Sequence, residues 1–299
     1  DNKIAFRDQI PLTEEEDKVD KITSTFFNIM KPKVGDRRIM GLCIIIPGII
    51  DAENKRILST VIGVGYSDPV VQRFEEAFHD YPFCLLNDTA CFAYAEYVFA
   101  NITEPNFAYI NVSKGVGACL FANGKMLRGA GGNATQFGHF SVDRNGPLCA
   151  CGNHGCVERV VGENALTERA EACGIDLTRF AGRKPLYCDI GAMAEDGDAH
   201  AKELIKDLAV DLSFAISNLI TLFNPSLVVI GGMGVNLGPF FLSNIRDEVQ
   251  NSGFKEFVSN TWIQYSTLGL DSELGGAARY YIDHYYDFFE QMQGGLYAD

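Results

Sequence analysis

Apolar runs alternate with amphipathic segments in the first third of the chain. Residues 13–30, TEEEDKVDKITSTFFNIM, have a threonine in the cap position, an acidic first turn and apolar residues at helical spacing, which predicts a helix. The run 39–51, IMGLCIIIPGIID, is apolar and β-branched, which predicts a buried strand interrupted by Pro-Gly. A helix over 68–81, a short strand over 82–88 and a buried helix over 89–100 follow. This alternation predicts an α/β protein with a largely parallel sheet.

The pattern restarts after residue 105. Residues 106–130 predict a β-meander, with an Asn-Gly turn before its last strand. A long helix is expected over about 199–223, followed by a buried strand within NPSLVVIGGMG, residues 224–234. Shorter helices are expected over 163–173 and 188–195. A meander followed by helices and buried strands is typical of one half of an actin-like ATPase (ribonuclease H-like) fold.

This order of elements predicts two lobes with mixed sheets flanked by helices. The N-terminal lobe is expected over 1–103, completed by a C-terminal helix over 272–299, and the C-terminal lobe over 104–271. The chain starts at Asp1, and its first residues resemble the end of a hairpin, so we expect the first lobe to be truncated at its start.

Composition narrows the class of partner. The 299 residues carry a formal net charge of −14, which argues against this polypeptide binding nucleic acid by itself, because phosphate contacts need clustered Lys and Arg. Small ligands or protein partners are expected instead. No apolar run approaches the ~18 residues of a membrane span. The nine cysteines are odd in number and several lie in apolar surroundings, which favours a cytoplasmic location.

Four potential metal ligands crowd into one loop, residues 138–158. His139, Cys149, Cys151 and Cys156 are spaced H-x9-C-x-C-x4-C, and nitrogen and sulfur ligands on a tight Gly- and Pro-containing loop suit tetrahedral Zn²⁺. Free core cysteines are the first alternative, but the neighbouring residues are polar and show no apolar periodicity. A redox pair is the second, but it leaves a third thiol unexplained. Four protein ligands would leave no open position, so we predict a structural zinc, with His154 facing solvent or bonded to backbone.

The segment GGNATQFGHFSVDRNGPLCACGNHGCVE, residues 131–158, resembles the signature of the ROK family, named for repressors, open reading frames and kinases. The resemblance extends over nearly the whole chain, through IPG at 46–48, ND at 87–88, NPSLVVIGG at 224–232 and LGGAA at 274–278. It implies an actin-like, two-lobed fold that binds a sugar or sugar phosphate between its lobes, and a homodimer or homotetramer.

Carried over by position, the resemblance assigns residues to the sugar. Asn87 and Asp88 would bond sugar hydroxyls, and Asp88 would be the catalytic base if the protein were a kinase. Gln136, His139 and Glu158 would also bind the sugar, so His139 would serve both zinc and sugar. From the residues alone, Asn87-Asp88 can equally be a strand-to-helix turn with an aspartate cap.

Departures from the family pattern separate two functions. The first phosphate-binding turn of ROK kinases, an Asp-Ile-Gly-Gly-Thr-type motif, is absent from the sequence. The second, Gly-Thr-Gly-x-Gly, is replaced by Ser113 to Gly117, a degenerate loop that retains Lys114, Gly115 and Gly117. Gln136 stands where the family has glutamate.

The chain keeps the family's sugar-binding residues Asp88, His139 and Glu158, whereas its phosphate-binding turns depart from the family pattern. We therefore expect the sugar-sensing effector domain of a transcriptional repressor, not catalytic itself, whose DNA contacts lie in a missing N-terminal segment. The alternative is an ATP- and Mg²⁺-dependent kinase of a hexose or amino sugar.

Overall fold

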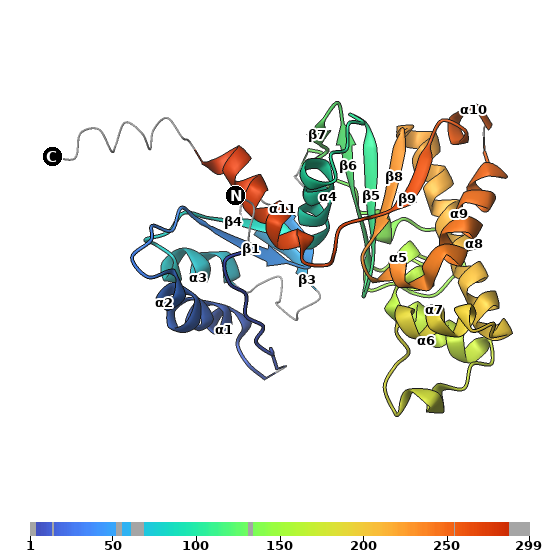
Figure 1. Cartoon of the computed structure of the whole chain (residues 1–299), viewed down its shortest axis with the longest axis horizontal. Helices are drawn as coiled ribbons and strands as arrows, with labels where there is room; N and C mark the ends of the chain where they lie inside the picture. The colour runs from blue at the N-terminus through green and yellow to red at the C-terminus, as the bar shows by residue number, and fades with distance from the viewer. Residues whose placement is uncertain are drawn as a thin grey trace. The chain divides into compact units, whose positions relative to one another are not determined.

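The structure, a computed structural model, describes residues 4–13, 15–51, 56–60, 69–130, 134–253 and 255–286. The chain divides into two compact units. The first unit comprises Asp1–Asn101, Gly129–Asn133 and Asp271–Asp299, and the second comprises Ile102–Arg128 and Ala134–Leu270. Figure 1 labels their helices and strands.

In the first unit the helices and strands are α1 (Lys18–Thr25), a π-helical turn (Phe26–Met30), α2 (Lys31–Val34), β1 (Leu42–Ile46), β2 (Gly48–Asp51), β3 (Arg56–Thr60), α3 (Val70–Ala77), β4 (Phe83–Asn87), α4 (Asp88–Phe99) and α11 (Ser272–Tyr285). Strands β1 and β4 pair in parallel, and β2 and β3 form an antiparallel pair with a bulge between Ile49 and Ile50.

The predicted single strand over 39–51 is two strands in different sheets. Pro47 separates β1 from β2, and because proline has no N–H it cannot continue the ladder of β1. The chain therefore leaves the sheet of β1 at this residue. Ile44 and Ile46 of β1 pack with Leu85 of β4 and with residues of α1 and α3 to form the core of this unit.

The predicted helix over 13–30 starts later than expected. Its cap is Asp17, whose carboxylate accepts a hydrogen bond from the Asp20 N–H at 2.9 Å and pairs with Arg73 of α3. Thr13 instead bonds Glu16, through its own N–H and hydroxyl. Asp17 is the better cap because Arg73 holds its carboxylate in place. The end of the predicted helix over 272–299 lies outside the described residues beyond Tyr286.

In the second unit the elements are β5 (Phe107–Val112), β6 (Val116–Ala122), β7 (Lys125–Met126), a 3-10 turn (Phe137–His139), α5 (Val157–Val161), α6 (Glu163–Ala172), a 3-10 turn (Leu177–Phe180), α7 (Tyr187–Glu195), α8 (Ala199–Phe223), β8 (Leu227–Gly231), a 3-10 turn (Met233–Leu237), α9 (Gly238–Gln250), α10 (Lys255–Val258) and β9 (Trp262–Tyr265). The strands form one sheet in the order β7-β6-β5-β8-β9.

This sheet is mixed, as a meander followed by crossovers requires. Strand β5 is antiparallel to β6 and parallel to β8, and β8 is parallel to β9. Alternate residues of β5 (Ala108, Ile110 and Val112) join one continuous core with the buried side of α8. In Figure 1 the long helix α8 lies beside α9, next to this sheet.

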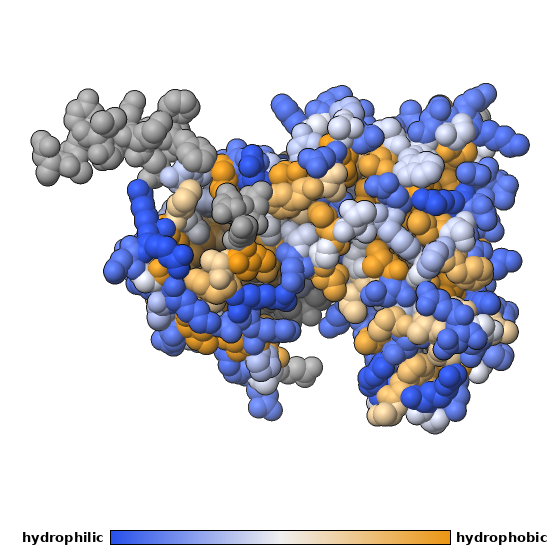
Figure 2. Space-filling model, viewed as in Figure 1, coloured by the Kyte–Doolittle hydropathy of each residue, from blue (hydrophilic) through white to orange (hydrophobic). Residues whose placement is uncertain are grey.

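No helix among the described residues is both long and apolar enough to cross a bilayer. On the face drawn in Figure 2, hydrophilic residues are interspersed with apolar ones. The exposed side of α8 changes along its length, from charged residues such as Lys202 and Lys206 to Val210, Phe214 and Leu222.

Candidate functional site

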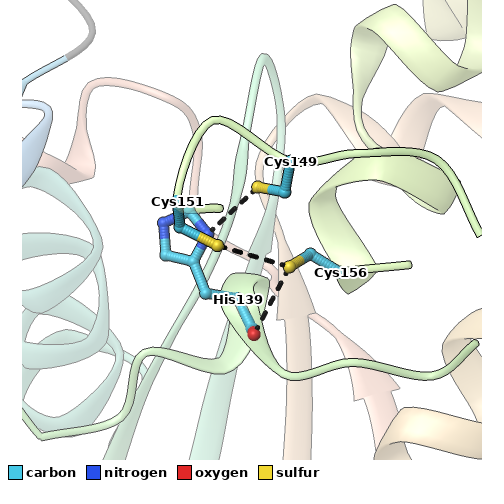
Figure 3. A group of neighbouring side chains, drawn as sticks. All are labelled: His139, Cys149, Cys151 and Cys156. Atoms are coloured by element: carbon cyan, nitrogen blue, oxygen red, sulfur yellow. Dashed lines mark hydrogen bonds between the residues drawn. The ribbon is translucent and has the colours of Figure 1, made fainter. Parts of the chain in front are cut away.

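The four predicted metal ligands come together in the second unit. The imidazole and thiol groups of His139, Cys149, Cys151 and Cys156 converge on one point in Figure 3, and their ligand atoms all lie within 4.8 Å of one another. Cys149 Sγ lies 3.6 Å from His139 Nδ1, and Cys151 Sγ lies 3.6 Å from Cys156 Sγ. The cluster could therefore hold a metal ion.

The two separations of 3.6 Å are close to two edges of a tetrahedron around zinc. Bond lengths of about 2.3 Å to sulfur and about 2.0 Å to nitrogen give edges of roughly 3.8 Å between two sulfurs and roughly 3.5 Å between sulfur and nitrogen. Burial, together with the neighbouring thiols of Cys151 and Cys149, raises the pKa of Cys156 to about 12, so a bound metal would have to displace the proton of this thiol. The donor set and its spacing fit zinc.

The loop around the cluster folds tightly because of one glycine. Gly155 has a φ of +59°, and a Cβ there would lie 1.8 Å from the carbonyl oxygen of Asp143. Its carbonyl accepts a hydrogen bond from Val142 N–H at 2.8 Å, which positions Cys156 beside Ser141. His154 is exposed and its Nδ1 lies 3.0 Å from the Gly146 carbonyl, which confirms its predicted bond to backbone.

The metal cluster leads directly into the segment that carries Glu158. Cys156 is the N-cap residue of α5, and Glu158 lies in the first turn of that helix. A Cβ on Gly115 would lie only 2.5 Å from Glu158 Oε2, so the Glu158 carboxylate rests against the degenerate phosphate loop. The structure thus brings together Glu158 and Gly115, two residues that the sequence assigned to sugar and to nucleotide.

The degenerate loop, Ser113–Gly117, is hydrogen-bonded to other residues of the second unit. The Ser113 hydroxyl donates to Asn111 Oδ1 at 3.1 Å and accepts from the Met233 N–H at 3.1 Å. The buried Tyr187 hydroxyl donates to the Ser113 carbonyl, and Lys114 is exposed. The Ser113 hydroxyl therefore makes its hydrogen bonds within the protein.

Gln136 precedes, and His139 ends, a 3-10 turn that lies against β6. A Cβ on Gly138 would lie 1.8 Å from the Val116 carbonyl oxygen, so only glycine permits this close approach. The His139 N–H donates to the Gln136 carbonyl at 3.0 Å, and the Gln136 side chain is exposed. His139 and Glu158 are each half-buried in this unit.

Asn87 and Asp88 belong to the first unit, at the junction of β4 and α4. The cap of α4 is Asn87, not Asp88 as the sequence had indicated: its Oδ1 accepts from the Ala90 N–H at 3.1 Å, and its Nδ2 donates to the Gly48 carbonyl at 2.6 Å. Asp88 is the first residue of α4 and is half-buried. Burial raises its pKa above the ordinary value, although hydrogen bonds from Thr89 oppose this.

Asp88 lines a cavity of about 410 Å³, a size suited to a small organic ligand. The wall is formed by residues of β1, α4 and α11 and by the proline after β1, namely Cys43, Ile45, Pro47, Asp88, Glu273 and Leu274. Sequence reasoning missed Glu273, whose pKa is raised by burial and by the charge of Asp88. The sequence predicted that the helix over 272–299 completes the first lobe, but neither this prediction nor spacing shows that Glu273 lies beside Asp88.

Known proteins resemble this chain over most of its length. The family model described as "ROK family" matches residues 1–283. The xylose repressor of Bacillus subtilis is 26% identical over 250 residues, covering 83% of this chain and 62% of the repressor. The DNA-binding transcriptional dual regulator NagC of Escherichia coli is 28% identical over 249 residues, covering 81% and 60% respectively. The chain thus spans about three-fifths of the length of these relatives.

Solved structures share the fold. A ROK family transcriptional regulator, described as a homologue of the E. coli MLC protein, aligns with a TM-score of 0.75 at 24% identity, covering 87% of this chain and 67% of its own. A ROK family glucokinase from Streptomyces griseus, in complex with glucose and AMPPNP, aligns with a TM-score of 0.74 at 24% identity, covering 87% of each chain. The chain belongs to the ROK family and has its actin-like ATPase fold.

Proposed function

We propose that this chain is the sugar-sensing effector region of a ROK-family transcriptional regulator. One observation carries the proposal: the Ser113 hydroxyl is bonded on both sides within the protein, to Asn111 and to Met233, while Asp88 stays directed into a ligand-sized cavity. A protein that keeps its sugar contacts and closes the nucleotide side can detect a sugar without phosphorylating it.

The sugar contacts come from both units. Asp88 and Asn87 supply acceptors and a donor from the first unit, and Gln136, His139 and Glu158 supply them from the second. A carboxylate accepts hydrogen bonds from two hydroxyl groups at once, which suits vicinal sugar hydroxyls. The relatives are named for xylose and N-acetylglucosamine, so a pentose, a hexose or an amino sugar is the ligand class we propose.

The His/Cys cluster is proposed to hold a structural zinc ion. Zinc, when bound, would keep three thiolates and one imidazole together and would do no chemistry, because four protein ligands leave no open position. The protein's own residues then do the positioning: Cys156 starts α5, and α5 presents Glu158. His139 would serve the metal through Nδ1 and present the other side of its ring to the sugar.

DNA binding is proposed for the whole protein rather than for these residues. The chain covers only about three-fifths of its regulator relatives, one of which is named as DNA-binding. An acidic effector region is compatible with a basic DNA-contacting segment elsewhere in the protein. A homodimer or homotetramer is the assembly we propose.

A sugar kinase is the second candidate, favoured by the glucokinase fold match and by Asp88, which would act as the base towards a sugar hydroxyl. It would require ATP and Mg²⁺ at the loop Ser113–Gly117. Lys114, which is exposed, is the one residue of that loop that adds a positive charge.

One experiment separates the two functions. The purified chain is titrated calorimetrically with xylose, glucose, N-acetylglucosamine and their 6- or 5-phosphates where they exist, and ADP formation is followed with each sugar in the presence of ATP and Mg²⁺. We expect saturable binding of one sugar class with no sugar-dependent ADP. ADP production in proportion to sugar would establish the kinase and overturn the regulator.

A further inference from the structure

Two cysteines of the first unit face each other across neighbouring strands. Cys43 of β1 and Cys84 of β4 are register partners in the parallel pair. Side chains of register partners emerge on the same face of a sheet. The Cys84 thiol donates to Cys43 Sγ at 3.8 Å, and the Cys43 thiol donates to the Ala277 carbonyl of α11 at 3.4 Å. The two thiols are therefore in contact.

The backbone spacing suits a covalent bond between them. Adjacent strands lie about 4.8 Å apart, and disulfides form between Cα atoms about 4.4 to 6.8 Å apart. The spacing between the strands therefore lies within the range of a disulfide, and closing it requires rotation about the side-chain bonds and a small approach of the two Cβ atoms.

The two thiols differ in access and in acidity. Cys43 is half-buried and lines the 410 Å³ cavity, so a small oxidant can reach it. Cys84 is 5% exposed, and its pKa is raised by its hydrogen bond to Cys43 and by burial, so it remains a protonated thiol. Cys43 is thus the sulfur that an oxidant reaches first, and Cys84 is the sulfur that can react with it afterwards.

We propose that Cys43 and Cys84 are a peroxide-oxidisable dithiol, in which a hydroperoxide entering the cavity oxidises Cys43 and Cys84 then closes a disulfide between β1 and β4. In the first step the Cys43 thiol gives up its proton and its sulfur attacks one oxygen of the hydroperoxide. The S–O bond of Cys43–SOH forms, the O–O bond breaks, and the leaving oxygen takes up the proton and departs as the alcohol or water. In the second, Cys84 sulfur displaces hydroxide from Cys43–SOH and loses its proton, releasing water. Two thiols are oxidised by two electrons and one hydroperoxide is reduced.

The inference rests on the first unit alone and does not depend on sugar binding. The test treats the whole chain with a slight excess of hydrogen peroxide, blocks remaining thiols with N-ethylmaleimide and maps peptides without reduction. The digestion must cut between Cys84 and Cys91, which lie seven residues apart in the sequence. We expect a Cys43–Cys84 cross-linked peptide, reversed by dithiothreitol and at least tenfold more abundant than any Cys43–Cys91 peptide.

Variants separate the two steps. In Cys84→Ala, Cys43 should stop at the sulfenic acid, which dimedone captures; in Cys43→Ser, Cys84 should stay reduced. Cys188→Ser, at an exposed cysteine of the second unit, is the control and should leave the cross-link unchanged.

Two outcomes would refute the proposal, one in the wild-type protein and one in Cys43→Ser. Sulfinic acid at Cys43 with Cys84 still open to alkylation would show that the pair does not close. Oxidation of Cys84 at an undiminished rate in Cys43→Ser would show that Cys43 is not the entry point.

Discussion

Burial of one carboxyl group, Asp88, lowers the folding stability at neutral pH. Its pKa is raised by burial, so the folded protein holds this proton to a higher pH than the unfolded chain does. Stability therefore falls as pH rises through the window between the two pKa values, and the cost is present in full at neutral pH. Asp88→Asn removes the charge at nearly constant shape, so we expect Tm to rise by up to a few degrees at pH 7.

Two measurements check this prediction. Thermal unfolding should show the gain at pH 7, and the gain should shrink as pH falls towards the ordinary aspartate pKa. Sugar affinity should drop by about tenfold or more, because a charged acceptor is lost. Asp36→Asn, at an exposed carboxylate of the same unit, is the matched control and should change neither quantity. A variant that loses stability while binding sugar normally would contradict the role given to Asp88.

Gly115 is the residue that lets Glu158 reach its position. A methyl group in Gly115→Ala would lie 2.5 Å from Glu158 Oε2 and must displace that carboxylate. We predict roughly tenfold weaker sugar binding, with the fold retained, because the carboxylate end of a side chain can move more easily than backbone. Gly269→Ala, where nothing lies within 4 Å, should bind sugar as the wild type does. Equal sugar affinities of the two variants, measured by calorimetry, would show that Glu158 does not bind the sugar.

Among the elements, α5 depends most on the metal cluster. A helix of five residues has too few internal hydrogen bonds to be stable by itself, and its N-cap residue, Cys156, belongs to the cluster. Removing the proposed zinc ion with a strong chelator should therefore speed amide exchange in Val157–Val161 by tenfold or more. Exchange in the buried middle of α8 should not change.

The histidines of the loop provide the control for this prediction. His139→Ala should lower the bound zinc well below one ion per chain and reproduce the faster exchange in α5. His154→Ala should keep the zinc, since His154 is exposed and bonds the Gly146 carbonyl. Metal analysis by mass spectrometry, together with exchange, decides the matter; uniform exchange with and without chelator would mean that the metal does not order α5.

Elements with strong periodicity were predictable from the sequence, and those set by single polar contacts were not. Helix α8 runs over Ala199–Phe223 as predicted, because its apolar residues recur at helical spacing over six turns. The predicted start of α1 was wrong, because Asp17 rather than Thr13 is the N-cap. Arg73, which is distant in the sequence, pairs with the Asp17 carboxylate. Local patterns do not reveal such partners.

In the candidate site, too, some residues were predictable from the sequence and others were not. The converging ligands His139, Cys149, Cys151 and Cys156 were predictable, since metal ligands on one short loop are constrained by the loop itself. The lining of the Asp88 cavity by Glu273 and Cys43 was not, because it depends on how α11 packs on β1 and α4. Sequence reasoning identified the chemistry of the loop and missed the wall of the cavity.

At the scale of the whole molecule, the proposed contacts divide between the two units, with Asp88 in the first and Glu158 in the second. If one sugar molecule bonds both residues, it favours conformations that bring them within reach of one ligand, because a ligand shifts the population towards the state that it binds better. We predict that saturating sugar lowers the radius of gyration measured by small-angle scattering. In Asp88→Asn, which loses the charged contact of the first unit but keeps Asn87, the same sugar concentration should lower the radius of gyration less than it does in the wild type. Identical scattering of the wild type with and without bound sugar would mean that sensing does not proceed through closure, and a signal to DNA would then have to arise within one unit.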